Sequence, residues 1–237
     1  MYEKFSDLYD LLTFDIPYKT YAENIFKILA KRGIKAGNLL EIGCGTGNIT
    51  RELAKGALDI LAFDISSEML AHAGAKLEGL ENVILFQEDM FEFNYDMYEF
   101  DAVVSLLDVT NYMTEEEDMA FVFDKAYKVL KEGGVFIFDV NSKNKLFDLL
   151  GNNTFVYEYD NVFYTWENEV VDDLVYFDLT FFVKGDDGKY TRIEEHQVER
   201  YYPIDFNMEK LKEAGFGEIG YMDEDTGSKI TEETQRI

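Results

Sequence analysis

The chain has 237 residues, of which 47% are hydrophobic, enough to build one domain with a substantial core. Its 22 basic and 48 acidic residues give a formal net charge of −26. This charge argues against sequence-independent binding to nucleic acid and against binding to an anionic membrane surface. The only cysteine, Cys44, excludes a disulfide framework and a CxxC zinc site. Because the N-terminus lacks a secretory pattern and no apolar run approaches the length of a membrane span, we expect a cytoplasmic protein.

The first two thirds of the chain predict a parallel sheet with helices on both faces. Strands are expected at 39–42, 58–63, 83–87, 100–106 and 135–140. Helices are expected between and before them, at 18–31, 48–55, 66–77 and 114–131. Thr114 and Glu117 form a T-x-x-E capping box that should begin the last helix, and Gly133 and Gly134 should end it. Short apolar strands separated by helices are typical of an α/β fold.

From about residue 154 the pattern changes to strands without helix-length connections. These segments are 155–159, 162–171, 174–183 and 189–202, and they should pair antiparallel. A helix at 207–214 and a strand at 216–222 follow. The sequence therefore predicts a core with a helical leader (1–153), an antiparallel β insertion (154–203) and a return to the core sheet (204–237).

The glycine-rich turn after the first strand is the most informative segment. A strand that feeds a helix through Gly43, Gly45 and Gly47 lets a ligand approach bare backbone at a helix N-terminus. Asp64, at the end of the next strand, is placed to bind a ribose diol. The dinucleotide pattern G-x-G-x-x-G is not met, because Asn48 stands where its third glycine would fall. This spacing disfavours an NAD-dependent oxidoreductase.

Several segments together resemble the class I S-adenosylmethionine-dependent methyltransferases. They are E-I-G-C-G-T-G at 41–47, F-D-I-S-S-E-M-L at 63–70, Q-E-D-M at 87–90, F-D-A-V-V-S-L at 100–106 and L-K-E-G-G-V at 130–135. The resemblance implies a Rossmann-like, mostly parallel sheet of the seven-stranded type, with S-adenosylmethionine as cofactor. A tight turn without a ligand is the alternative for the glycine loop.

The resemblance also assigns residues to the parts of the cofactor. The methionine end falls to Glu41 and the Gly43–Gly47 turn, the ribose to Asp64, the adenine to four residues, and the sulfonium to the end of the fourth strand. The cofactor residues expected are Glu41, Gly43, Cys44, Gly45, Gly47, Asp64, Ile65, Met69, Asp89, Met90 and Leu106. Core packing is the alternative for Met69, and capping a turn is the alternative for Asp89.

Three further segments are similar to small-molecule N-methyltransferases of the glycine and amino-sugar type. They are S-L-L-D-V-T-N-Y at 105–112, the leader at 2–18, and E-H-Q-V-E-R-Y-Y at 195–202. The candidate catalytic residues are Asp108 and His196. The candidate substrate residues are Tyr9, Tyr18, Asn111, Tyr112 and Arg200. By alternation, Glu194, His196, Val198, Arg200 and Tyr202 share one strand face.

Each of these assignments has a structural alternative. Asp108 could be an exposed turn acid, the two leader tyrosines could pack in the core, and His196 and Arg200 could pair with acids across strands. A magnesium site at Asp108, Asp139 and Asn141 is disfavoured, because Val140 separates the Asp-Asn pair that such enzymes keep adjacent. We therefore expect no metal.

The predicted reaction is methyl transfer to nitrogen or oxygen of a small-molecule acceptor by in-line displacement. Alignment of the reactants supplies much of the acceleration in such a reaction. The alternative is a non-catalytic module that binds S-adenosylmethionine for regulation or interaction. The family's last strand would barely have begun at Thr234–Ile237, so a homodimer that covers the exposed sheet edge is a further hypothesis.

Overall fold

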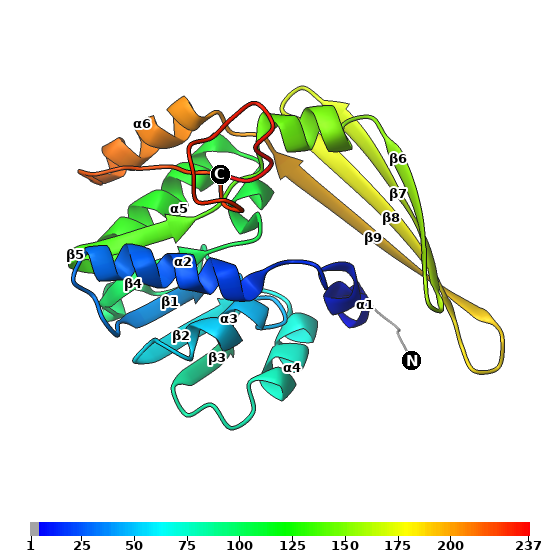
Figure 1. The fold of residues 1–237 in the computed structure, drawn as a ribbon, viewed down its shortest axis with the longest axis horizontal. Helices are drawn as coiled ribbons and strands as arrows, with labels where there is room; N and C mark the ends of the chain where they lie inside the picture. Colours follow the sequence, from blue (N-terminus) through cyan, green and yellow to red (C-terminus); the bar gives the residue numbers. More distant parts are fainter. Residues whose placement is uncertain (1–4) are drawn as a thin grey trace.

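The computed structural model describes residues 5–237, which form two sheets with a short helix, α1 (Phe5–Leu12), between them (Figure 1). The first sheet is parallel, with the strand order β3-β2-β1-β4-β5. Its strands are β1 (Asn38–Ile42), β2 (Asp59–Asp64), β3 (Val83–Gln87), β4 (Phe100–Ser105) and β5 (Leu130–Phe138). A parallel sheet with a separate antiparallel sheet confirms the predicted Rossmann-like class.

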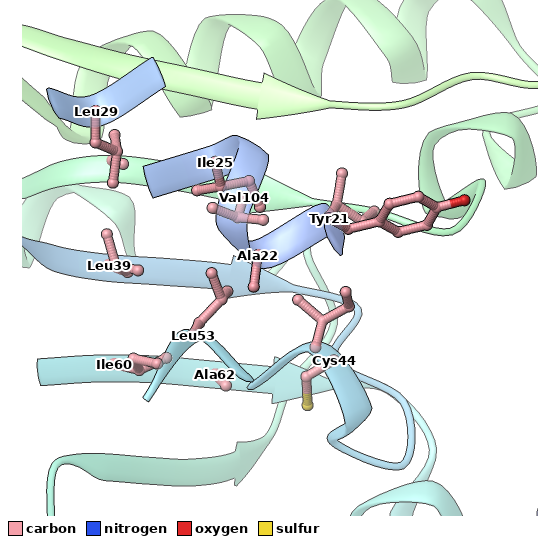
Figure 2. Packing of buried hydrophobic residues seen from close by; sticks show 13 residues of the cluster. Tyr21, Ala22, Ile25, Leu29, Leu39, Cys44, Leu53, Ile60, Ala62 and Val104 are labelled. Atoms are coloured by element: carbon pink, nitrogen blue, oxygen red, sulfur yellow. The ribbon is translucent and has the colours of Figure 1, made fainter. Parts of the chain in front are cut away.

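Helices cover both faces of the parallel sheet, as its buried strands require. They are α2 (Tyr18–Lys31), α3 (Asn48–Leu53), α4 (Ser67–Lys76), α5 (Glu116–Val129) and α6 (Ile204–Ala214), with short helical turns η1 (Tyr95–Met97), η2 (Val109–Tyr112) and η3 (Asn144–Leu150). Successive side chains of a strand face opposite sides of the sheet. Leu39 therefore packs against α2 and α3 on one face, while Leu40 packs against α5 on the other. Figure 2 shows Tyr21, Ile25 and Leu29 of α2 above the strands.

The start of α5 differs from the predicted capping box. Its N-cap is Glu115, without a side-chain hydrogen bond, and the helix begins two residues after Thr114. The hydroxyl of Tyr202 instead donates to the carbonyls of Met113 and Glu115 at 2.6 and 2.9 Å, which fixes the chain just before the helix. Gly133 and Gly134 do not end α5 either, because they lie inside β5, which starts directly after the helix.

The second sheet is antiparallel and has the order β6-β7-β8-β9. Its strands are β6 (Thr154–Tyr159), β7 (Val162–Val171), β8 (Leu174–Lys184) and β9 (Tyr190–Arg200). Every second residue of β8 is buried, from Val175 to Val183, and this face packs on Leu8 of α1 and Leu146 of η3. The N-terminal helix therefore contributes directly to the core of the second sheet.

The last residues of the chain join the first sheet by a single bridge. The strand predicted at 216–222 is not formed, and five strands are present where the resemblance implied seven. Instead, Ile237 and Val140 exchange two backbone hydrogen bonds of 3.0 Å, and Ser142 donates to the carbonyl of Gln235. This pairing places Arg236 beside the carboxyl ends of β4 and β5. Within residues 5–237, no helix combines the length and apolar composition needed to span a membrane.

Candidate functional site

A cleft of about 1300 Å³ lies at the carboxyl ends of the parallel strands. Its lining comes from the ends of the central strands, from α1 and from the inward face of the second sheet, and includes Gly43, Asp64, Asp89, Asp108, Tyr9, Trp166, Phe177, Gln197 and Glu199. The strand order reverses between β1 and β4, which is where open α/β sheets bind ligands. Single small-molecule sites span roughly 300 to 1,000 Å³, so this cleft is larger than a typical site for one small molecule.

The glycine loop allows close packing on both of its sides. Gly43 has φ +72°, and a Cβ atom there would lie 2.6 and 2.7 Å from the methyl carbons of Val109. Its amide donates to the carbonyl of Phe63 at 2.9 Å, which ties the loop to β2. Gly47 has φ +79° and faces Ala73 of α4, not the cleft. The absence of a side chain at Gly47 therefore allows close packing on α4, and the contact of its backbone with the cofactor stays a prediction.

Two buried polar atoms below the loop have no partner among the described residues. They are Oε2 of Glu41 and the hydroxyl of Tyr18. Both residues line a small extension of the cleft together with Cys44 and Leu106. Burial raises the pKa of Glu41 to about 8. Because an unpaired buried polar group is costly, these atoms indicate a place for a polar part of a ligand.

The carboxylate of Asp64 is fixed by the backbone around it. It accepts hydrogen bonds from the amides of Gly45 at 2.8 Å and Ser66 at 2.9 Å, and it faces the cleft. Ile65 and Met69 lie beside it in the cleft wall, and Ile65 is 65% exposed although it is large and apolar. An exposed apolar side chain next to an oriented carboxylate suits a ligand with a ring and a diol.

Asp89 and Met90 also line the cleft, after β3. Asp89 accepts a hydrogen bond from the amide of Phe91 at 2.9 Å, so it caps a turn as well as facing the cleft. Contact with the adenine and capping of a turn are alternatives for Asp89 in the sequence, and the structure is compatible with both at once.

The leader helix is attached to the glycine loop by Asp10, which the sequence analysis did not identify. Its carboxylate accepts hydrogen bonds from the Thr46 hydroxyl at 2.6 Å and the Asn48 amide at 2.8 Å, and pairs with Lys76 at 2.8 Å. Tyr9 is its neighbour and faces the cleft. No local pattern relates residue 10 to residue 46, so only the fold shows this contact.

The turn after β4 is held in an unusual conformation by Asp139. Leu107 and Asp108 both have positive φ, 63° and 59°. Non-glycine residues in this region cost of order 1–3 kcal/mol each, so the surroundings must hold them there. Their amides donate to the two carboxylate oxygens of Asp139 at 2.8 and 2.7 Å. Asp139 therefore has a structural role at the base of the cleft.

Asp108 is neither exposed nor free, in contrast to its predicted alternative as an exposed turn acid. Its carboxylate pairs with Arg236 at 2.6 Å, and Arg236 also binds Asp139 at 2.9 Å. Burial alone would raise the pKa of Asp108, but the charges of Arg236 and Lys145, together with the hydrogen bond from Arg236, outweigh it and hold the pKa below its usual value. These interactions make Asp108 a permanent anion and a poor proton acceptor. No sequence pattern points to Arg236.

The side chains of Asn111 and Arg200 bind other parts of the protein, which gives no support to the substrate contacts predicted for them. Asn111 is fully buried, donates to the carbonyl of Arg200 at 2.8 Å and accepts from the amide of Asn141 at 2.9 Å. The guanidinium of Arg200 donates to the carbonyl of Thr114 and pairs with Glu116. Both side chains are thus used to join β9 to the end of β4 and the start of α5. Tyr112 does line the cleft.

The inward face of β9 is the opposite one from the face chosen from sequence. Ile193, Glu195, Gln197 and Glu199 are the less exposed residues of the alternating pattern. The side chain of His196 is 72% exposed and pairs with Asp178 across the strands at 2.5 Å, as its structural alternative predicted. Alternation defines two faces but does not tell which one is buried. The pairing with Asp178 favours the structural alternative, and a catalytic role of His196 stays a prediction.

Glu199, on the inward face of β9, is a buried residue on which the charge of Asp108 acts. It is 5% exposed, and its Oε2 accepts a hydrogen bond from the Asn141 side chain at 2.6 Å. Burial and the negative charge of Asp108 raise the pKa of Glu199 to about 8. Strand alternation does not point to Glu199, because it does not tell which face of the strand is buried.

Comparisons with known proteins agree with this geometry. A family model described as a methyltransferase domain matches residues 39–134. A putative methyltransferase from Geobacillus sp. (strain WCH70) is 34% identical over the whole chain and 97% of its own length. The crystal structure of an S-adenosylmethionine-dependent methyltransferase from Clostridium acetobutylicum is 36% identical, with a TM-score of 0.89 over 98% of this chain and 94% of that one.

A more distant relative has a defined acceptor. The dTDP-3-amino-3,4,6-trideoxy-α-D-glucopyranose N,N-dimethyltransferase of Streptomyces venezuelae is 31% identical over 58% of this chain and 57% of its own length. The full-length similarities, together with the glycine loop and the acid at the end of β2, identify the family. The chain belongs to the class I S-adenosylmethionine-dependent methyltransferases.

Proposed function

We propose that this methyltransferase acts on a small-molecule acceptor, at a nitrogen or an oxygen atom. The observation that carries the proposal is the cleft itself, which is bounded on one side by the parallel sheet and on the other by α1 and the second sheet. A cleft bounded in this way favours a compact acceptor over a polymer. The similarity to an amino-sugar N,N-dimethyltransferase supports the same substrate class.

The residues of the cleft fit S-adenosylmethionine. The unpartnered carboxylate oxygen of Glu41 suits the amino group of the methionine part, and Gly43 leaves no side chain between the loop and Val109. Asp64 would hold the ribose diol, and Ile65 and Met69 would pack on the adenine. Further candidates that line the cleft or its extension are Cys44, Gly45, Asp89, Met90 and Leu106.

The cofactor supplies an electrophilic methyl group on a sulfonium. The chain has to hold an acceptor in line with that group and to keep water away, which is where the rate enhancement arises. Tyr9, Tyr112 and Gln197 are the polar side chains that we assign to acceptor orientation, because they face the cleft from α1, η2 and β9. Tyr112 donates to Gln197 at 3.1 Å, so the two are already positioned relative to each other. Tyr18, with its unpartnered hydroxyl beside Glu41, is assigned to the methionine end.

The proposal extends to the location of the enzyme and to its oligomeric state. The acidic net charge and the single cysteine support a cytoplasmic enzyme whose acceptor is not a nucleic acid. A homodimer stays a prediction, which sedimentation equilibrium tests directly. The alternative of a non-catalytic module gains nothing from the relatives, which are named as methyltransferases.

Calorimetric titration with S-adenosylhomocysteine, with NADH in parallel, tests the cofactor site on the wild type and on Asp64→Ala. We expect micromolar binding of the thioether, weakened by the substitution, and no binding of NADH. A panel of small amines and hydroxy compounds with S-adenosylmethionine then tests the acceptor class. A protein that binds the thioether but methylates no compound of the panel would contradict the proposed function.

A further inference from the structure

Two carboxyl groups meet at the floor of the cleft, from segments far apart in the sequence. Asp108 follows β4 and Glu199 lies on the inward face of β9; both border the cleft, and the negative charge of Asp108 acts directly on Glu199. Two carboxylates placed in this way cannot both stay ionised at low cost, so the pair retains one proton. Arg236 pairs with Asp108 at 2.6 Å, which keeps the charge on Asp108 and leaves the proton to Glu199.

The polar and titratable groups around Glu199 come from several segments that border the cleft. They are Asp108 and Tyr112 from the segment after β4, Asn141 and Lys145 from the segment after β5, Arg236 near the C-terminus, Tyr9 from α1, and Glu195 and Gln197 from β9 itself. Lys145 binds the Asn141 side chain at 2.7 Å, and Asn141 in turn binds Glu199 at 2.6 Å. The side chain of Glu199 is therefore fixed by Asn141, which is itself bound to Lys145, while its carboxyl group also borders the cleft.

We propose that Glu199 is the proton acceptor for the methyl acceptor, with Asp108, Arg236 and Asn141 as its positioning residues. The inference rests on the proposed function, because it needs an acceptor that arrives with a proton on the reacting atom, such as an ammonium group or a hydroxyl. Glu195, Gln197 and Tyr112 surround the same part of the cleft and offer hydrogen-bond partners for that group.

The step balances without any further reactant. An acceptor ammonium transfers one proton to the Glu199 carboxylate, which frees the nitrogen lone pair. That lone pair forms the bond to the methyl carbon as the bond from carbon to sulfur breaks with its electrons on sulfur. The proton leaves Glu199 for solvent before the next turnover. Asp108 keeps its charge throughout, because Arg236 compensates it.

The proton affinity of Glu199 fits this role. Burial and the charge of Asp108 raise its pKa to about 8, and a base with a pKa near the working pH is the most effective. The group accepts a proton only when it is ionised. The rate should therefore rise with pH up to about 8 and level off above it. Transfer to a positioned base contributes typically 10²- to 10⁴-fold in rate, which sets the loss expected without it.

The experiment compares the wild type with Glu199→Gln and with Glu194→Gln as a matched control. Glu194 lies on the same strand but on its outer face, where it pairs with Arg192. With the most reactive amine or alcohol of the acceptor panel, we expect Glu199→Gln to lose about 10²-fold or more in kcat/KM and to lose the pH-dependent rise. Affinity for S-adenosylhomocysteine should stay within about twofold of the wild type, as should all properties of Glu194→Gln.

A spectroscopic measurement on the wild-type protein tests the same inference if Glu199→Gln folds poorly. In wild-type protein labelled with ¹³C at the glutamate carboxyl and saturated with S-adenosylhomocysteine, one resonance should titrate near pH 8. Its absence would overturn the inference, and so would a Glu199→Gln variant with the wild-type rate and pH profile. Those results leave the proposed function intact, whereas a wild type that methylates no acceptor overturns the proposed function and the inference with it.

Discussion

Asp10 in α1 accepts a hydrogen bond of 2.6 Å from the hydroxyl of Thr46 in the glycine loop. The same helix buries Leu8 in the core of the second sheet. A single turn of helix therefore joins the cofactor loop to the sheet that bounds the acceptor side of the cleft. The two halves of the site are connected through this helix, so a change at Asp10 should be detectable in cofactor binding.

Asp10→Asn should weaken the binding of S-adenosylhomocysteine about fivefold. The substitution keeps the shape of the side chain but removes the charge that pairs with Lys76. The loss corresponds to about 1 kcal/mol, because Asp10 is half exposed and solvent screens the pair. Isothermal titration calorimetry measures it. Glu23→Gln, which removes only an exposed ion pair with Lys19 on α2, should bind like the wild type.

Binding of S-adenosylhomocysteine should release about one proton from Glu41 at pH 7. Burial raises the pKa of Glu41 to about 8 in the free protein, so the group is mainly protonated there. An ammonium group at Oε2 favours the ionised form and lowers this pKa. The apparent affinity should therefore increase with pH up to about 8 and level off above it. Calorimetry in buffers of different ionisation enthalpy counts the protons.

Glu41→Gln provides the control for that measurement. The amide cannot ionise, so proton release should vanish and the affinity should become independent of pH between 6 and 8, roughly the interval in which Glu41 titrates. Proton release that persists in Glu41→Gln would assign the titration to another group.

Gly43→Ala should destabilise the protein by more than its backbone conformation alone explains. The new Cβ would lie 2.6 Å from a methyl carbon of Val109. Gly79→Ala is the matched control, because Gly79 also has positive φ, 86°, but faces open space. The control should cost about 1–2 kcal/mol, and Gly43→Ala about 1–3 kcal/mol more. Urea unfolding gives both values.

A second substitution tests the cause of the Gly43→Ala effect. Val109→Ala removes the two methyl groups that the new Cβ would meet, so the double variant should regain the packing part of the loss. Strictly additive effects would show that the two residues do not collide.

Arg236→Ala should cost about 3–5 kcal/mol in the free energy of unfolding. Its guanidinium pairs with Asp108 and Asp139, and its removal leaves these buried carboxylates without their cation. Arg32→Ala, which breaks a surface pair with Glu218, should cost less than about 1 kcal/mol. Equal effects of the two variants in urea unfolding would contradict the central role given to Arg236.

Elements that depend on neighbours along the chain were predicted well from the sequence. The helix expected at 18–31 and the strand expected at 83–87 have those bounds in the structure, because their apolar periodicity is local. The capping box predicted at Thr114 is wrong, because the start of α5 depends on a residue distant in the sequence. The hydroxyl of Tyr202 binds the carbonyls of Met113 and Glu115 just before the helix.

The same distinction holds for the site. The sequence alone determined the parallel sheet, the glycine loop and the acid of β2, because each is encoded by residues next to one another. Only the tertiary structure decided that Asp108 is neutralised by Arg236, that Glu199 is buried whereas His196 is exposed and pairs with Asp178, and that Asp10 binds the loop. Contacts between distant segments depend on how the two sheets and α1 pack. Residue spacing does not encode that packing, and the packing determines the charge state of each carboxyl group.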